Sequence, residues 1–106
     1  MVTPEKVKRA IEKIIEISHP RQLILFGSYV RGDINSNSDL DVLVVVDDDT
    51  VSPRQESVRI RRALRGISMS MDILVISEAR LRTVAALPGL IYSEALNKGE
   101  TVYRAA

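Results

Sequence analysis

The chain has 106 residues, enough for a single hydrophobic core, and we expect residues 1–106 to form one domain. Hydrophobic residues make up 45% and charged residues 27%, as in a soluble globular protein, and the net charge of +1 gives no overall attraction to nucleic acid or to an anionic membrane. The lack of cysteine excludes disulfides and zinc–thiolate sites, and no apolar run is long enough for a membrane span, so we expect a cytoplasmic protein.

The first half of the chain predicts one helix and two strands. A helix is expected between Thr3-Pro4, which is typical of a helix start, and His19-Pro20. Its apolar stripe consists of Val7, Ala10, Ile11, Ile14 and Ile15. The apolar runs at 23–26 and 40–46 predict two buried strands, and the acidic residues at 47–49 predict a polar turn after the second.

The second half predicts further helices alternating with strands. Ser52-Pro53 starts a helix, which is followed by a strand at 71–76 and by a short helix that Ser77 caps. A last helix is expected over 90–98, and residues 101–104 predict a small edge strand. Such an alternation favours an α/β (α+β) fold in which helices pack on a small sheet.

A glycine–serine turn follows the first predicted strand. Gly27 allows the backbone to approach a ligand closely, and the N–H groups that open a short helix at Ser28 form an anion site. The alternative is an ordinary turn in which Ser28 caps the helix, and the turn taken alone favours that interpretation. The lysine and the glycine spacing of a Walker loop are missing.

Two aspartates stand at the start of the second predicted strand. Residues two apart in a strand face the same side, so Asp39 and Asp41 are expected on one face, about 6.6 Å apart. Leu40 and Val42 then face the core. Like charges on one face repel, and a bound divalent cation reverses that cost. The alternative is the solvated, fraying start of a strand, which fits Asp39 better than Asp41.

A third aspartate, Asp72, lies inside the apolar strand predicted at 71–76. An acid there is costly unless it is paired or solvated at the end of the strand. If this strand lies beside the one that follows Asp39, three carboxylates converge. Three such ligands suit a site with two metals about 3.5–4 Å apart, which promotes in-line phosphoryl or nucleotidyl displacement. The alternative is an edge position that faces water.

Together these motifs resemble the signature of minimal nucleotidyltransferases of the DNA polymerase β-like superfamily, and in particular of antitoxins paired with HEPN-domain ribonuclease toxins. The signature is a Gly-Ser pair, ten residues, and then Asp-x-Asp, which Gly27-Ser28 and residues 39–41 match. Ser38 and the third carboxylate, Asp72, also match. The resemblance covers residues 23–76 and implies a nucleotidyltransferase fold, with a small mixed sheet like the polymerase β palm.

The resemblance also implies a reaction. Asp39, Asp41 and Asp72 are expected to be catalytic and to hold two Mg²⁺ ions. Gly27, Ser28 and Ser38 are expected to bind the nucleotide, which is ATP or another nucleoside triphosphate. Asp72 would also orient or deprotonate the acceptor hydroxyl. The implied product is AMP transferred to a tyrosine of the partner HEPN toxin, which makes the chain an antitoxin.

A second interpretation remains open at this stage. The chain is short, and no helical substrate domain follows the matched motifs, so the acceptor is expected on another protein. A non-catalytic antitoxin that neutralises a helical partner by occlusion, as part of a homo- or hetero-oligomer, fits these features too. The three acids favour the enzyme, because an occluding subunit has no need of them.

The remaining charged segments are expected to be solvated. Arginines crowd the helix that follows Ser52: Arg54, Arg59, Arg61, Arg62 and Arg65. Their spacing spreads them over the polar side, which favours a solvated or partner-facing surface. With only 4% aromatic residues there is no base-stacking platform, so direct nucleic-acid binding is not expected. Arg31 is expected to pair with Asp33, and the alternative is that it reaches a phosphate.

Overall fold

The computed structural model describes residues 1–35, 37–50 and 52–106. Its elements are, in chain order, α1 (Pro4–Ser18), β1 (Gln22–Phe26), α2 (Ser28–Arg31), β2 (Leu40–Val46), α3 (Pro53–Ala63), β3 (Met71–Ser77), α4 (Glu78–Ala85), α5 (Ile91–Lys98) and β4 (Glu100–Arg104). The predicted sequence of helices and strands is confirmed. The strand at 40–46 has the expected bounds, and the other strands differ from expectation by one residue at one end.

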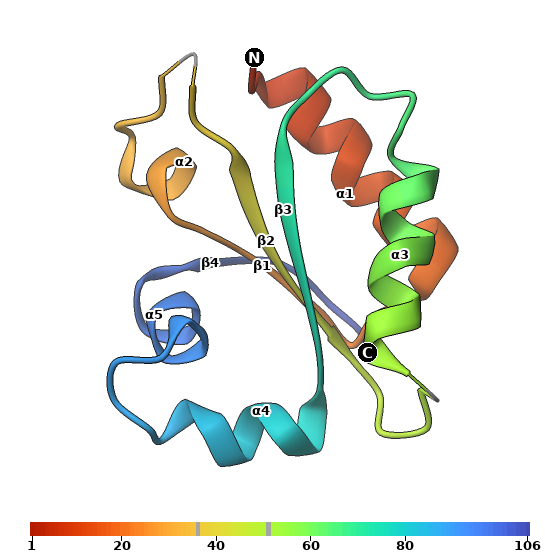
Figure 1. Ribbon diagram of the computed structural model, residues 1–106, viewed down its shortest axis with the longest axis vertical. Helices are drawn as coiled ribbons and strands as arrows, with labels where there is room; N and C mark the ends of the chain where they lie inside the picture. The colour runs from red at the N-terminus through yellow and green to blue at the C-terminus, as the bar shows by residue number, and fades with distance from the viewer. Residues whose placement is uncertain (36, 51) are drawn as a thin grey trace.

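The strands form one mixed sheet in the order β3-β2-β1-β4. β1 pairs antiparallel with both β2 and β4, whereas β2 and β3 are parallel. Two parallel neighbours need a crossover connection, which here contains α3. This helix runs alongside β3 and packs against α1 (Figure 1). Because β2 and β3 are parallel neighbours, both begin at the same edge of the sheet.

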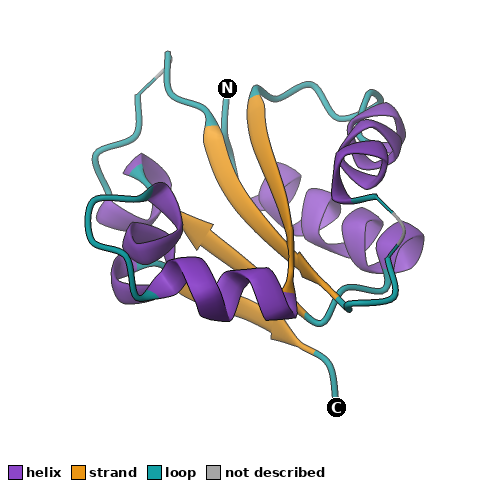
Figure 2. Ribbon diagram, turned by 60° about the horizontal axis from the view of Figure 1, so that its bottom comes forward, coloured by secondary structure: helices purple, strands orange, loops and turns teal. Residues whose placement is uncertain are grey.

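Helices cover both faces of this sheet (Figure 2). Side chains alternate along β2: Leu40, Val42 and Val44 belong to the core under α1 and α3. Leu43 and Val45 point to the opposite face and pack in a second cluster with residues of α4 and α5. A strand that is buried on both faces must be almost wholly apolar, which explains the run at 40–46 and makes its one acid, Asp41, stand out.

Local sequence signals explain where the helices begin. The hydroxyl oxygens of Thr3, Ser52 and Ser77 accept hydrogen bonds from the N–H groups of Lys6, Gln55 and Arg80, the third residue after each cap. The caps expected at Ser52 and Ser77 are therefore confirmed. In the part of the chain that the structure describes, no helix is both long and apolar enough to cross a membrane.

Candidate functional site

The register of the two parallel strands brings two of the predicted acids together. Asp41 of β2 is the direct partner of Asp72 of β3. Partners in a parallel pair project from the same face, so both carboxylates lie side by side at the start of their strands. Asp41 is half-buried, and the side chain of Asp72 is 47% exposed. The expectation that the third predicted strand lies beside the second is confirmed.

Asp39 reaches the same edge by a different route from the one expected. β2 begins at Leu40, so Asp39 lies just before the strand and is exposed. Its carboxylate Oδ1 accepts a hydrogen bond from the hydroxyl of Ser70, the residue before β3. The Ser70 carbonyl in turn accepts from the Leu40 N–H at 2.9 Å. Ser70, which the sequence did not single out, thus holds the entry to β2 against the entry to β3.

The acids at this edge act on one another. Burial raises the pKa of Asp41 above its usual value of 3.8, and the neighbouring charges of Asp72 and Asp39 raise it further. Arg31 lowers the Asp41 pKa, and Glu94 of α5 adds a smaller upward effect. The site therefore concentrates negative charge around a half-buried carboxylate. Glu94 was not expected here, because nothing in the sequence places α5 against this end of β2.

Gly27 is fitted to Asp41. Its φ of 78° and ψ of −152° belong to a region that only glycine adopts readily. A Cβ atom built on Gly27 would collide with Oδ2 of Asp41. The backbone at the end of β1 thus lies directly against the carboxylate, as expected of a glycine that allows close approach. Sequence reasoning had predicted the approach of a ligand at Gly27 but not this contact with Asp41.

The turn after Gly27 is short and tightly closed. In α2 the N–H groups of Gly32 and Asp33 both donate to the Ser28 carbonyl, and Gly32 is left-handed with a φ of 83°. Ser28 is half-buried. Arg31 Nε pairs with Asp33 Oδ2 at 3.2 Å, which confirms the expected ion pair. The α2 turn therefore carries Ser28 next to the Gly27–Asp41 contact.

Ser38 is bound into the loop that leads to Asp39. Its hydroxyl accepts a hydrogen bond from the Asn35 N–H at 3.0 Å, and its own N–H donates to the Asn35 carbonyl at 3.0 Å. A second bond, from the Asn37 N–H to Asn35 Oδ1, tightens the same turn. The structure thus gives Ser38 a role in shaping the loop that delivers Asp39.

Arg61 of α3 reaches over the edge strand towards the site. Its Nη2 donates to the Ile73 carbonyl at 2.9 Å and lies 3.8 Å from Asp72 Oδ1. β3 is the last strand on this side of the sheet, so its outward backbone groups are open to such a contact. The guanidinium thereby ties α3 to the third predicted acid. The sequence indicated an exposed arginine at position 61 but gave no sign of this contact.

We call the starts of β2 and β3, where Asp39, Asp41 and Asp72 lie, the acidic edge. Its side chains are suitable ligands for a cation, but they do not form a complete coordination shell. Among the described residues, no three acidic or histidine side chains lie close enough together to hold a metal ion by themselves. The donor set is nonetheless a suitable one, because Mg²⁺ typically takes one or two carboxylates and completes its shell with water and phosphate oxygens. Asp41 and Asp72 can supply that pair, and Asp39 lies at the same edge.

The hollows of the surface lie elsewhere. One of about 630 Å³ lies on the outer face of α3, and another of about 640 Å³ runs along α5 and includes Glu94. Five of the best-formed hollows in the described ranges include neither the three aspartates nor Gly27. We place the candidate site at the acidic edge, because hollows report shape alone whereas the edge carries the reactive groups.

Comparisons with known proteins identify the family of the chain. The family described as the nucleotidyltransferase domain matches residues 5–100. A protein of Methanocaldococcus jannaschii, provisionally named protein adenylyltransferase MJ0141, is 36% identical over 72 residues, which is 67% of this chain and 69% of that protein.

Two solved structures share the fold. One is a crystal structure of a provisionally identified nucleotidyltransferase from Sulfolobus solfataricus, with a TM-score of 0.62 and 20% identity, covering 94% of this chain and 78% of that one. The other is a crystal structure of a toxin–antitoxin with AMP-PNP, with a TM-score of 0.59 and 22% identity, covering 92% and 73%. The expected α/β fold, a mixed sheet flanked by helices, is thereby confirmed.

Proposed function

The chain belongs to the nucleotidyltransferase domain family, and from that premise we propose that it moves AMP from ATP to a tyrosine hydroxyl of a partner HEPN-domain toxin. One observation carries the proposal: Asp41 lies in register with Asp72 and directly against the backbone of Gly27. A glycine turn and paired carboxylates in contact are what a triphosphate with its counter-ions needs.

The nucleotide would be held at the turn between β1 and α2. Ser28 offers its hydroxyl and backbone N–H beside Gly27, and the absence of a Cβ at Gly27 lets the Asp41 carboxylate lie against this turn. Ser38 contributes by shaping the loop before Asp39. Gly27, Ser28 and Ser38 are thus the proposed nucleotide-binding residues.

The three aspartates are the proposed ligands of two Mg²⁺ ions. When bound, such ions supply charge compensation for the triphosphate and for the leaving pyrophosphate. The raised pKa of Asp41 supports this role, because a half-buried carboxylate crowded by Asp72 and Asp39 gains most from an added cation. Asp39 is kept in place by Ser70, and Asp72 by Arg61.

The proposed transfer is a substitution at the α-phosphorus. The acceptor oxygen forms a bond to the α-phosphorus, the bond from that phosphorus to the bridging oxygen breaks, and pyrophosphate departs with the bond electrons. The acceptor proton passes to the carboxylate of Asp72, the most open of the paired acids, and from there to water. No oxidant or reductant is needed, and the products are the AMP ester and pyrophosphate.

Two findings support a protein acceptor. The Methanocaldococcus relative carries the name of a protein adenylyltransferase, and one structure with the same fold is a toxin–antitoxin with AMP-PNP. The alternative, neutralisation of the toxin by occlusion alone, is favoured by no contact in the site. It predicts that the acids are dispensable, which makes it testable by substitution.

A label-transfer experiment tests the proposal. Purified protein with Mg²⁺ is incubated with lysate of the source cell and with each of the four nucleotides labelled at the α-phosphate. We expect a labelled band that depends on the added protein with α-labelled ATP and no such dependent band with γ-labelled ATP, because the α-phosphorus is the one transferred. Bands made by kinases of the lysate appear without the added protein.

Asp72→Asn should abolish the band. Asp49→Asn is the matched control, because Asp49 is an exposed acid in the turn beyond the opposite end of β2 and should leave the band unchanged. A band that persists in Asp72→Asn would contradict the assigned role. No band with any nucleotide, together with a stable partner complex, would favour occlusion.

Occlusion and catalysis separate further in cells that express the partner. If the Asp39→Asn/Asp41→Asn double variant still binds the partner but no longer neutralises it, the protein acts as an enzyme. If neutralisation is retained without the two acids, occlusion is sufficient and the transferase proposal for this partner fails.

A further inference from the structure

The outer face of α3 carries an excess of positive charge that the fold does not use. Five arginines and one acid, Glu56, occupy residues 53–65. Two of the arginines are engaged: Arg59 pairs with Glu56 at 2.8 Å, and Arg61 reaches Asp72 and the Ile73 carbonyl. For the other three, Arg54, Arg62 and Arg65, the described residues provide no ion pair or side-chain hydrogen bond.

The placement of Arg54 has a cost. It stands in the first turn of α3, directly after Pro53, where the helix dipole favours acids and disfavours a cation. Arg62 lies three residues after Arg59 on α3, and like charges at that spacing repel each other. Arg54 thus carries its charge at the end of the helix that disfavours a cation, whereas Arg62 lies in the last turn, where a cation is favoured.

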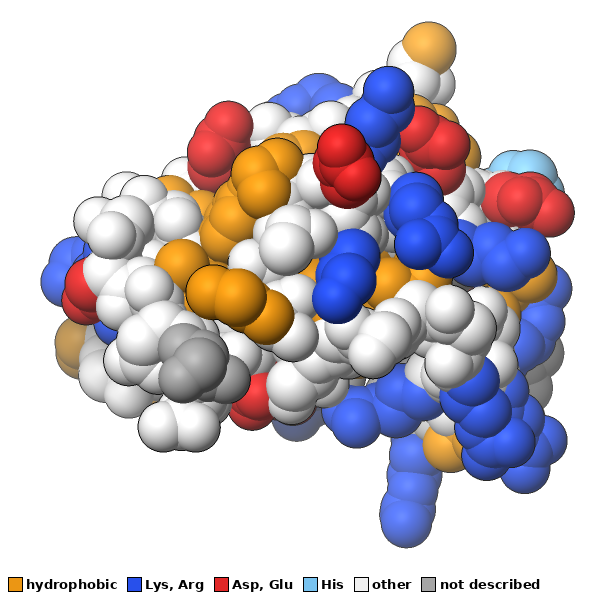
Figure 3. All heavy atoms as spheres, turned by 90° about the horizontal axis from the view of Figure 1, so that it is seen from above, with side chains coloured by type: hydrophobic (Ala, Val, Ile, Leu, Met, Phe, Trp, Pro, Cys, Tyr) orange, Lys and Arg blue, Asp and Glu red, His pale blue; other side chains and the backbone are white. Residues whose placement is uncertain are grey.

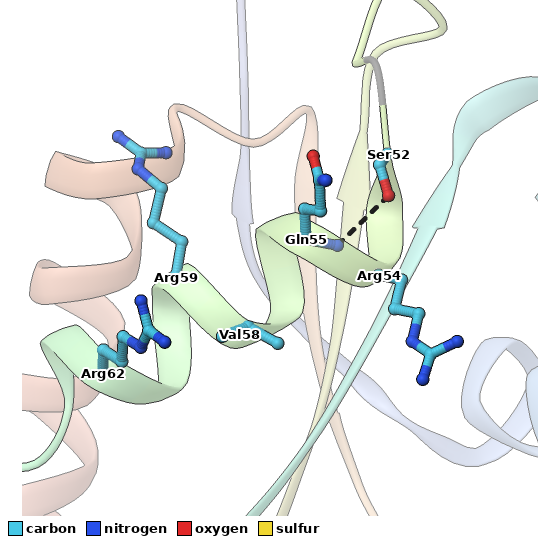
Figure 4. Close-up of a pocket in the computed structure, with 6 residues that line it drawn as sticks. All are labelled: Ser52, Arg54, Gln55, Val58, Arg59 and Arg62. Carbon is cyan, nitrogen blue, oxygen red and sulfur yellow. Dashed lines mark hydrogen bonds between the residues drawn. The ribbon is translucent and has the colours of Figure 1, made fainter.

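Two of the unused arginines, Arg54 and Arg62, line a hollow with the apolar Val58 between them. The hollow, of about 630 Å³, is lined by Ser52, Arg54, Gln55, Val58, Arg59 and Arg62. Val58 is 44% exposed and lies between Arg54 and Arg62 along the helix (Figure 4). Lys and Arg side chains also crowd the part of the surface where α3 lies when the molecule is seen from above (Figure 3). We call the six lining residues the arginine face.

From this arrangement we propose that the arginine face docks an acidic helix of a partner protein. Arg54, Val58 and Arg62 follow one another at every fourth residue, a repeat of about 6 Å, which is the spacing at which another helix presents a row of side chains. An apolar centre ringed by arginines is typical of protein interfaces, in which arginine is enriched and lysine is depleted.

The same features argue for a protein over a nucleic acid. The cations of α3 are all arginine, whereas α1 carries Lys6, Lys8 and Lys13 with a single arginine. Arginine binds carboxylates through paired, planar hydrogen bonds that lysine cannot make. The face has no aromatic residue for stacking bases, and the pI of the chain, about 8.1, is below that of typical nucleic-acid-binding domains.

The docked helix would run along α3, and the Arg62 end of the arginine face would bring it near the acidic edge. α3 packs along β3, and Arg61, the neighbour of Arg62, contacts Asp72. A partner on the arginine face is therefore held beside the strand that carries Asp72. The inference concerns binding alone and stands whether or not the chain transfers a nucleotide.

Binding of a synthetic helical peptide tests the proposal. The probe carries glutamates along one face of the helix with a leucine between successive glutamates, and these residues follow one another at every fourth position. The control peptide has the same composition, but its glutamates are spread over all faces. Fluorescence anisotropy is measured at about 50 mM and about 500 mM salt, because charge pairing weakens with screening. We expect the patterned peptide to bind at least about tenfold more tightly than the control, and more weakly at high salt.

Charge reversal locates the surface. Arg54→Glu/Arg62→Glu should abolish the preference for the patterned peptide. Arg80→Glu/Arg104→Glu makes the same change in net charge at exposed arginines on α4 and β4 and should retain it. Both variants are first compared by circular dichroism and thermal melting. If Arg54→Glu/Arg62→Glu fails to fold, Val58→Ala takes its place. It removes the apolar centre without altering charge and should weaken binding about threefold to tenfold.

Three outcomes overturn the proposal. The first is equal affinity for both peptides, which would mean nonspecific charge attraction. The second is tighter binding of a single-stranded RNA oligonucleotide that Arg54→Glu/Arg62→Glu abolishes, which would assign the face to nucleic acid. The third is dimerisation of the chain in sedimentation velocity that the same variant prevents, which would assign the face to a second copy.

Discussion

Acids stand at both ends of β2, but the two ends differ in the burial of these acids and in their contacts. At its start, Asp41 is half-buried, lies against Gly27 and Asp72, and has a raised pKa. The turn beyond its end, at 47–49, is exposed, and there Asp48 Oδ1 accepts from the Ala79 N–H at 2.9 Å. At the start of β2, burial and the charges of Asp72 and Asp39 crowd Asp41, which suits it to bind a cation. Where the N-terminus of a helix lies nearby, as α4 does to Asp48, the acid accepts a hydrogen bond from a backbone N–H of that helix.

The turn at 47–49 bears out the expectation of a polar, solvated turn and adds a structural role. Asp47 Oδ1 accepts from the Asp49 N–H and from the Thr50 hydroxyl, which closes the turn. Asp48 connects the turn to α4. The two sets of acids therefore serve stability at one end of the strand and function at the other, and the predictions below test that division.

The largest expected effect is on catalysis. Asp41→Asn should reduce AMP transfer by at least about 100-fold, because it removes charge from the site where phosphate and its counter-ions would be held. Asp49→Asn should change transfer by no more than about twofold, as for an ordinary surface substitution. Initial rates of label incorporation measure both. Equal losses of activity in the two variants would contradict the assignment of catalysis to the start of β2 alone.

Gly27→Ala is expected to have the largest effect on stability. The new Cβ must occupy a glycine-only backbone conformation and collides with Asp41 Oδ2, so the free energy of unfolding should fall by about 2–3 kcal/mol. Gly66→Ala is the control, since no atom lies within 4 Å of a Cβ there, and it should stay within about 0.5 kcal/mol of the parent. Urea unfolding measures both; similar values would mean that the site tolerates rearrangement around Asp41.

Asp48→Ala should lower the free energy of unfolding by about 1 kcal/mol, the usual cost of losing a helix cap. AMP transfer should be unaffected because the lost bond lies at the far end of the strand. Asp49→Ala, whose side chain makes no such bond to α4, should be nearly neutral. A loss of transfer in folded Asp48→Ala would show that the two ends of β2 are coupled.

The smallest expected effect is a gain in stability. Without metal, Asp41→Asn should raise the free energy of unfolding by about 0.5 kcal/mol, because it relieves repulsion from the directly opposite Asp72.

This gain should depend on pH. Folding raises the pKa of Asp41 above 3.8, so the folded state binds the proton more tightly and the cost of the carboxylate is absent below pH 3.8. The cost appears as the pH rises through the raised pKa and is complete above it. The stability difference between variant and parent should therefore grow from acid to neutral pH, and a difference that shrinks over that range would contradict the direction of the shift.

Much of the site could be predicted because its signals are local. The glycine–serine turn, the spacing to Asp39 and Asp41, and Asp72 in the next strand are all legible in short stretches of chain. The bounds of β2 follow from its apolar run, and Thr3, Ser52 and Ser77 mark the helix starts. What these local signals do not contain is the bond that holds Asp39 in place, because it comes from Ser70, a residue far along the chain.

The sequence by itself determined the elements, the family resemblance and the candidate acids, since capping, turn formation and apolar periodicity depend on residues a few positions apart. Only the tertiary structure decided that Asp41 and Asp72 are paired in register, that Gly27 lies against the Asp41 carboxylate and that Arg61 reaches over β3. Those contacts depend on how both faces of the sheet pack against helices, because that packing sets the register in which the parallel strands lie. Short sequence patterns do not report how the helices pack on the two faces of the sheet.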